Sequence, residues 1–281
     1  EFQIVMVINE SFIQASDGTR LYLREWGDPS GANAIIVLLH GVGEHCQRYE
    51  HVARQACERG FFMLGYDRRG HGRSEGKQGL IGSVDQLVAD FSQVIAVARA
   101  KNPALPIFLY GHSMGALGVL YYALREKPQV KGIIATSPPL DSKTISKSKK
   151  MMVRLLDPIL PNLTVPSGLE QAAISRDQAV VEAYKADPLV HDKVSVRLGA
   201  YLNSAPEYVM AHASEWTLPL YLAHGSADRI CPISGSDAFV SKLSLPVTYQ
   251  RWEGLYHETH NEPEKELVIG TMLDWVESQL A

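Results

Sequence analysis

Short, almost fully apolar segments alternate with amphipathic segments along most of this 281-residue chain. Strands that are apolar on both faces are typical of a parallel sheet covered by helices on both sides. Such an alternation predicts an α/β fold with right-handed crossovers and excludes an all-helical or all-β protein. The expected strands are residues 35–39, 62–66, 107–110, 133–136, 220–223 and 247–252.

Five segments between or after these strands are expected to form helices. In the segment 84–101, apolar residues recur at spacings of three or four, which is the pattern of a helix with one face on the core. Before the first of these strands, segments 12–15 and 20–26 flank Asp17 and Gly18, a typical hairpin turn. The other expected helices are residues 49–59, 114–126, 236–243 and 263–280.

The alternation stops between Pro139 and about Ala213 and resumes at Leu218. This stretch has helical segments but no convincing strand. It is divided into short pieces by Pro158, Pro161, Pro166 and Pro188. We therefore expect a core of residues 1–138 and 214–281 that is interrupted by a helical cap of residues 139–213. The cap is expected over the carboxyl ends of the strands, where open α/β sheets bind ligands.

Composition narrows the class of protein. The chain is 46% hydrophobic and 21% charged, which is ordinary for a globular protein, and its net charge of −4 lacks the basic footprint of a nucleic-acid binder. The start of the chain shows no signal-peptide pattern, and Cys46, Cys57 and Cys231 lack metal-site spacing. We expect a cytoplasmic protein with no metal site and no nucleic-acid partner.

The strongest local motif is Gly-His-Ser-Met-Gly at residues 111–115, between an expected strand and an expected helix. A sharp strand-to-helix turn leaves no room for side chains on either side of Ser113, which explains the glycines. The turn presents the Ser113 hydroxyl above the sheet and places the Met114 N–H where it can face an oxyanion. The pattern predicts a nucleophile elbow, and the alternative is an ordinary turn.

A serine nucleophile needs a histidine base and a carboxylate, which follow it in this chain order in such folds. Asp228 lies in the loop after the fifth expected strand, and His257 lies at the end of the last one. We expect Ser113, Asp228 and His257 to form a catalytic triad. His260, three residues later, is the alternative base.

The loop after the first central strand, residues 40–45, reads His-Gly-Val-Gly-Glu-His. Its glycines allow a backbone N–H to turn inward, and Val42 is the best candidate for a second oxyanion donor. His40 is expected to shape this loop through a backbone hydrogen bond.

Together, segments 39–45, 67–74, 111–115, 225–228 and 256–257 resemble the monoacylglycerol lipase / lysophospholipase family of α/β-hydrolases. The Gly-Glu-His sequence at 43–45 is the most discriminating piece. The resemblance implies an α/β-hydrolase fold and hydrolysis of a single acyl chain from glycerol without a cofactor. Val42 stands where the family often has alanine, which narrows the space beside it.

The resemblance also implies a polar end of the substrate pocket. Glu44, Arg48 and His260 would converge there around the glycerol hydroxyls, with Tyr184 of the cap as a weaker candidate. The alternative for Glu44 and Arg48 is a solvated ion pair one helical turn apart.

The segment after Asp141 is amphipathic. Either it lies in a membrane interface with its lysines at the headgroups, or it rests its apolar face on its own domain. Its apolar side carries Ile145, Met152 and Leu156, and its basic side carries Lys143, Lys147, Lys150 and Arg154.

These patterns predict a serine hydrolase that cleaves monoacylglycerols to fatty acid and glycerol through an acyl-enzyme, with peripheral membrane contact through the cap. A lysophospholipase or a short-chain carboxylesterase with the same triad is the alternative. A catalytically inactive hydrolase-fold binding protein is an alternative of another class.

Overall fold

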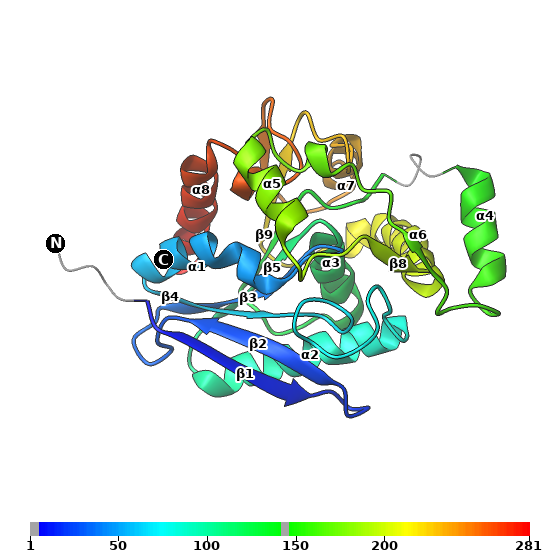
Figure 1. Ribbon diagram of the computed structural model, residues 1–281. Helices are drawn as coiled ribbons and strands as arrows, with labels where there is room; N and C mark the ends of the chain where they lie inside the picture. The colour runs from blue at the N-terminus through cyan, green and yellow to red at the C-terminus, as the bar shows by residue number, and fades with distance from the viewer. Residues whose placement is uncertain (1–5, 142–145) are drawn as a thin grey trace.

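An eight-stranded sheet runs through the centre of the protein, of which the computed structural model describes residues 6–141 and 146–281 (Figure 1). Its strand order is β1-β2-β4-β3-β5-β6-β9-β10. β2 pairs antiparallel with β1 and β4, and every other neighbouring pair is parallel. The expected hairpin and the mostly parallel sheet are therefore confirmed.

All six predicted strands and five predicted helices are present, with ends that differ by a few residues. The strands of the sheet are β1 (Ile8–Gln14), β2 (Arg20–Trp26), β3 (Ala34–Leu39), β4 (Phe61–Tyr66), β5 (Ile107–His112), β6 (Gly132–Thr136), β9 (Leu220–Gly225) and β10 (Thr248–Trp252). The flanking helices are α1 (Glu50–Glu58), α2 (Val84–Lys101), α3 (Met114–Glu126), α7 (Ser234–Val240) and α8 (Lys265–Ser278).

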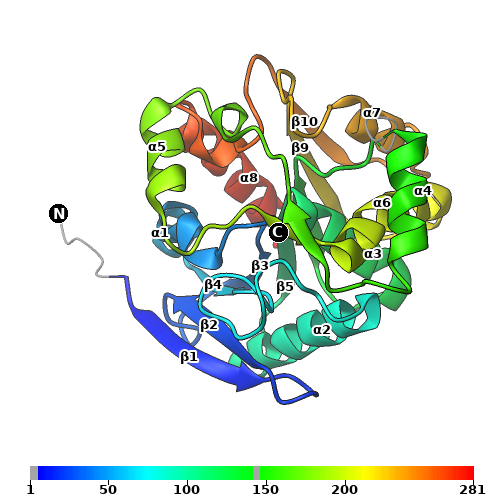
Figure 2. The same ribbon diagram turned by 45° about the vertical axis from the view of Figure 1, so that its right-hand side comes forward.

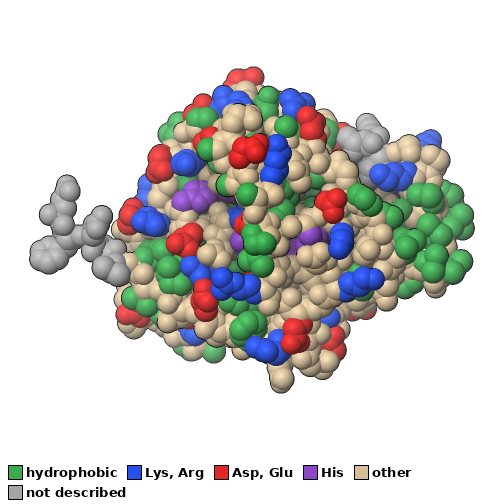
Figure 3. Space-filling view, viewed as in Figure 1, with side chains coloured by type: hydrophobic (Ala, Val, Ile, Leu, Met, Phe, Trp, Pro, Cys, Tyr) green, Lys and Arg blue, Asp and Glu red, His purple; other side chains and the backbone are tan. Residues whose placement is uncertain are grey.

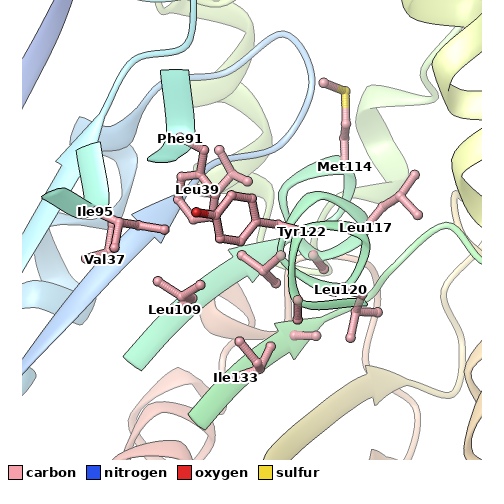
Figure 4. Packing of buried hydrophobic residues seen from close by; sticks show 14 of the residues in the cluster. Val37, Leu39, Phe91, Ile95, Leu109, Met114, Leu117, Leu120, Tyr122 and Ile133 are labelled. Atoms are coloured by element: carbon pink, nitrogen blue, oxygen red, sulfur yellow. The ribbon is translucent and has the colours of Figure 1, made fainter. Parts of the chain in front are cut away.

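The sheet separates two hydrophobic cores, and the alternation of side chains along each strand supplies both. Val37 of β3 packs with residues of α2, α3 and α7, among them Leu120 (Figure 4). Its neighbour Ile36 packs on the other face with residues of α1 and α8, among them Leu273. Figure 2 shows α1 and α8 on the side of the sheet opposite α2 and α3. Because both faces are covered at the centre of the sheet, β3 is apolar and buried throughout.

The described residues between β6 and β9, here called the insertion, contain more regular structure than the sequence predicts. The expectation of no strand was wrong, because β7 and β8 pair antiparallel; with three residues each they are too short to give a periodic pattern. The expectation of only short pieces was also wrong, because α6 has 17 residues. The elements are α4 (Lys147–Leu156), β7 (Thr164–Pro166), α5 (Gln178–Ala186), β8 (Lys193–Ser195) and α6 (Val196–His212).

Backbone hydrogen bonds tie the insertion to loops that follow the parallel strands. The His191 N–H donates to the Gly43 carbonyl after β3, and the Ser195 N–H donates to the Gly79 carbonyl after β4, each over 2.9 Å. The Glu258 N–H, after β10, donates to the Ile174 carbonyl over 2.7 Å. The insertion therefore covers the carboxyl ends of these strands.

Among the described residues, no helix combines the length and the apolar character that crossing a membrane requires.

Candidate active site

Strand register brings the candidate residues to one edge of the sheet. Leu39 at the end of β3 lies opposite both Tyr66 of β4 and Gly111 of β5. Thr136 of β6 lies opposite His112 of β5 and Ala223 of β9. Because these strands end at the same level, the loops that follow them meet above the centre of the sheet.

Ser113 occupies the sharp turn between β5 and α3, with φ +56° and ψ −123°. A serine rarely adopts this left-handed backbone, and the surrounding structure has to hold it there. A Cβ on Gly115 would overlap the Leu39 carbonyl oxygen, and a Cβ on Gly111 would overlap the Gly115 carbonyl group. The predicted strand-turn-helix context of Ser113 is confirmed.

The structure brings Ser113, Asp228 and His257 into one hydrogen-bonded chain. His257 Nε2 lies 2.9 Å from Ser113 Oγ, and His257 Nδ1 lies 2.7 Å from Asp228 Oδ2. All three residues are buried. In this arrangement the imidazole can take the serine proton while the carboxylate fixes its tautomer. His257 therefore has the geometry of the base, and His260 makes no hydrogen bond to Ser113.

The charges within and around these three hydrogen-bonded residues suit proton transfer. Burial favours the neutral imidazole, but the carboxylates of Asp228, Glu258 and Glu44, with Asp228 the largest contributor among them, together raise the pKa of His257. Burial likewise opposes ionisation of Asp228, yet His257 and His224 hold the pKa of that carboxyl below its usual range. Asp228 is thus ionised at neutral pH.

His224 is a partner of the acid that sequence reasoning missed. It is fully buried, and its Nε2 lies 3.1 Å from Asp228 Oδ2 and 2.7 Å from the Cys231 carbonyl oxygen. Its Nδ1 lies 2.8 Å from Ser236 Oγ. The only signal in the sequence is its position four residues before Asp228.

The two expected oxyanion donors are available. Within residues 6–141 and 146–281, neither the Val42 N–H nor the Met114 N–H donates a hydrogen bond. The loop of Val42 lies close to Ser113, since a Cβ on Gly41 would lie 3.4 Å from Ser113 Cβ. Free backbone donors beside a buried serine can stabilise a developing oxyanion.

Glu44 and Arg48 belong to a buried ionic network. Arg48 Nη1 donates to Glu44 Oε2 over 2.5 Å, and both Nη atoms of Arg48 donate to the Glu258 carboxylate over 2.7 Å. Glu44 Oε1 also accepts hydrogen bonds from the Gly41 N–H and the Tyr49 hydroxyl. A solvated ion pair is therefore the wrong interpretation of Glu44 and Arg48, because both side chains are at most 10% exposed. Sequence reasoning missed Glu258.

A cavity of about 20 Å³ is lined by Ser113 and His257 and also by Val42 of the loop after β3. Glu44 and Tyr184 line it, together with Glu258, Leu169 and Ile174 among others. The Arg48 guanidinium lies behind this wall, 4.7 Å from the centre of the Tyr184 ring.

His260 is not on the wall of this cavity. It is buried, its ring stacks on Tyr49 at 4.8 Å, and it lies 4.7 Å from the ring of His112. Neither of its ring nitrogens has a hydrogen-bond partner among the described residues. Burial holds the pKa of His260 well below its usual value, so its ring is neutral.

In the part of the chain that the structure describes, no three His, Cys, Asp or Glu side chains are grouped to hold a metal ion.

The sequence pattern of the serine aminopeptidase S33 family of hydrolases matches residues 30–264. The chain belongs to this family. A monoacylglycerol lipase of Mycolicibacterium smegmatis is 34% identical over 266 residues, which cover 94% of this chain and 95% of the relative. An uncharacterized abhydrolase domain-containing protein of Dictyostelium discoideum is 34% identical over 98% of this chain, but the chain spans only 30% of that protein.

The crystal structure of Paleococcus ferrophilus monoacylglycerol lipase superposes with a TM-score of 0.85 at 31% identity, over 92% of this chain and 99% of that one. The α/β-hydrolase fold and the resemblance to monoacylglycerol lipases are therefore confirmed. The protein is an ester hydrolase, and the alternative interpretation as a catalytically inactive binding protein is therefore wrong.

Proposed function

We propose that the protein hydrolyses monoacylglycerols to fatty acid and glycerol through an acyl-enzyme on Ser113. The observation that carries the proposal is the bridge that His257 makes between Ser113 Oγ and Asp228 Oδ2, over 2.9 and 2.7 Å. The monoacylglycerol lipases among its relatives support the substrate class.

In the proposed reaction, Ser113 Oγ attacks the ester carbonyl while His257 Nε2 takes its proton. The N–H groups of Val42 and Met114 hold the oxyanion, and Asp228 stabilises the imidazolium. His257 then protonates the leaving glycerol oxygen. Water, activated by the same histidine, releases the fatty acid from Ser113.

The leaving alcohol has to lie beside His257, because this residue gives it a proton. The cavity on that side has polar walls from Glu44 and Tyr184, which suit glycerol hydroxyls. Arg48 and His260 do not line the cavity, and Arg48 acts indirectly by holding the Glu44 carboxylate with a hydrogen bond. At about 20 Å³ the cavity holds roughly one water, so substrate has to displace side chains of the insertion. We therefore assign the insertion the role of a cap.

The substrate class is tested by comparing mono- and diacylglycerols, lysophospholipids and nitrophenyl esters that share one acyl chain. Monoacylglycerol is expected to give the highest kcat/KM among the natural lipids. Diacylglycerol is expected to be poor, because the closed alcohol side leaves no room for a second chain. A preference for lysophospholipids, or for simple short-chain esters, favours the corresponding alternative enzyme.

Tyr184→Phe is expected to lower kcat/KM for monoacylglycerol by about three- to tenfold, the effect of one hydrogen bond. For a nitrophenyl ester with the same acyl chain, kcat/KM should change little, because that leaving group has no hydroxyls to bind. Tyr184 is a cleaner probe than Glu44, whose carboxylate also holds the Gly41 N–H over 2.6 Å. Glu44→Gln should therefore reduce both rates. Equal losses in Tyr184→Phe favour a carboxylesterase.

We also propose that the cap touches lipid through α4 and the residues after it. Met151, Met152 and Leu155 are more than half exposed, and Ile159 is 72% exposed. Figure 3 shows hydrophobic side chains gathered at the edge where Figure 1 places α4. Exposed side chains of this kind in a lipid hydrolase fit an apolar membrane interface.

The basic side of α4 has a different environment from the one expected. Lys150 and Arg154 both form ion pairs with Glu207 of α6. The Lys150 side chain is only 17% exposed and faces its own protein, whereas the Arg154 side chain remains 61% exposed. Lys143 and Ile145 of the predicted pattern lie outside the described residues.

The double variant Leu155→Glu, Ile159→Glu is expected to weaken binding to phosphatidylcholine vesicles by at least about a hundredfold, since burying each side chain contributes roughly 1.5–3 kcal/mol. Co-sedimentation measures the effect. Leu267→Glu is the matched control, because Leu267 is 61% exposed on α8, outside the cap. Equal binding by the double variant and the wild type contradicts the lipid contact.

A further inference from the structure

Arg68, directly after β4, is a buried cation without a carboxylate partner. It is 4% exposed, and among the described residues it forms no ion pair. Its Nη2 donates to the Gly41 carbonyl over 2.5 Å, while its Nε has no acceptor. The neighbouring Arg69, by contrast, pairs with Asp90 and Asp17. A buried guanidinium stays charged, and here the Glu44 carboxylate stabilises that charge only from a distance, so the site can still take an anion in direct contact with Arg68.

Two hydroxyl groups accompany this guanidinium. Tyr66 and Tyr201 line the same cavity as Arg68, and each interacts electrostatically with it. In the described part of the chain neither hydroxyl makes a hydrogen bond. A guanidinium with two free hydroxyl donors is a donor set that suits a carboxylate.

The cavity has a volume of about 30 Å³, room for two to three water-sized spheres of roughly 10–15 Å³ each. That space suits the two oxygens of a carboxylate better than a long hydrocarbon chain. Its remaining walls are largely apolar and include Leu39, Phe91 and Met114, the first residue of α3; all three are labelled in Figure 4. These walls can pack a few methylene groups that lead to the carboxylate.

The position of the cavity assigns it to the acyl side of the ester. The alcohol has to lie beside His257, which protonates it, so the acyl group extends the other way from Ser113. The Arg68 cavity is bordered by Met114, the residue after the nucleophile, and it shares no lining residue with the cavity beside His257.

We propose that Arg68, Tyr66 and Tyr201 bind a carboxylate carried by the acyl group, so that monoesters of dicarboxylic acids are substrates. This inference deepens the proposed function and rests on Ser113 as the nucleophile. Arg68 then determines acyl specificity, and its bond to Gly41 links the occupied site to the loop of Val42.

The test compares two nitrophenyl esters of equal acyl length, mono-4-nitrophenyl adipate and 4-nitrophenyl hexanoate. Arg68→Met is expected to lower the adipate-to-hexanoate ratio of kcat/KM about ten- to a hundredfold, because a charged hydrogen bond is lost. Tyr201→Phe should lower the ratio less, and Arg68→Lys should retain part of it. The ratio is the readout, since Arg68→Met also removes a donor from Gly41 and can slow both esters.

A binding experiment keeps this inference separate from catalysis. In a Ser113→Ala background, calorimetry with monomethyl adipate and methyl hexanoate should show that Arg68→Met weakens only the adipate ester. An unchanged rate ratio together with unchanged affinity overturns the proposal and leaves Arg68 as a support for the Gly41 loop. If no ester is hydrolysed but adipate binding depends on Arg68, the proposed function fails and the carboxylate site stands.

Discussion

Replacing Ser113 by alanine is expected to lower ester hydrolysis by about 10⁴-fold or more while the fold is kept. The variant loses the oxygen that lies 2.9 Å from His257 Nε2, so the histidine no longer has a serine hydroxyl to deprotonate. The oxyanion donors of Val42 and Met114 stay in place and account for the residual rate above water. Turnover of a nitrophenyl ester and labelling by a fluorophosphonate measure the loss.

Two histidine variants serve as controls for this result. His257→Ala should cost about as much as Ser113→Ala, because the two residues act as a unit. His260→Ala should keep most activity toward a nitrophenyl ester, since His260 touches Tyr49 and His112 rather than Ser113. Retention of more than about a hundredth of the activity in Ser113→Ala contradicts its role as nucleophile.

The parts of the site that sequence predicts well are those that depend on local geometry. The turn at Ser113 needs glycine at 111 and 115, and both glycines belong to one motif of five consecutive residues that is visible in the sequence. The loop of Asp228 follows the buried strand β9, the loop of His257 follows β10, and the parallel pairing of these two strands aligns their ends. Element type and chain order are therefore enough to bring three distant residues together.

The parts that sequence does not reveal depend on partners far along the chain. The i,i+4 spacing of Glu44 and Arg48 is visible, but Glu258, which completes the network, lies 210 residues after Arg48. Without that partner, a buried network and a solvated pair have the same pattern. The same holds for Lys150 and Arg154. Their place on the basic side of the helix predicts exposed side chains, and their ion-pair partner, Glu207 of α6, is evident only in the structure.

Arg68 illustrates the converse case, in which a missing partner is informative. From sequence it is one of two adjacent arginines in a glycine-rich loop. Only the structure separates them, because Arg69 has two carboxylates and Arg68 has a carbonyl and an adjoining cavity.

Asp228→Asn is expected to lower kcat by about 10⁴-fold, because an amide favours the wrong tautomer of His257. The pH dependence should change as well. His257 has to be neutral to act as a base, so kcat/KM rises with pH through its pKa. Since Asp228 raises that pKa, the wild-type midpoint should lie above the value of about 6.5 of an ordinary histidine. Without the carboxylate, burial dominates, and the midpoint in Asp228→Asn should move to lower pH.

His224→Gln provides the matched comparison for this variant. It alters the other histidine on Asp228 Oδ2, 3.1 Å away, but keeps a side-chain donor and leaves the carboxylate beside His257. Its pH midpoint should therefore stay near the wild-type value, and its loss of kcat should be far smaller. A stopped assay from acid to neutral pH on all three proteins measures both quantities. If the pH midpoint of Asp228→Asn equals the midpoints of the wild type and of His224→Gln, the Asp228 carboxylate does not set the basicity of His257. A different residue is then the acid of the triad.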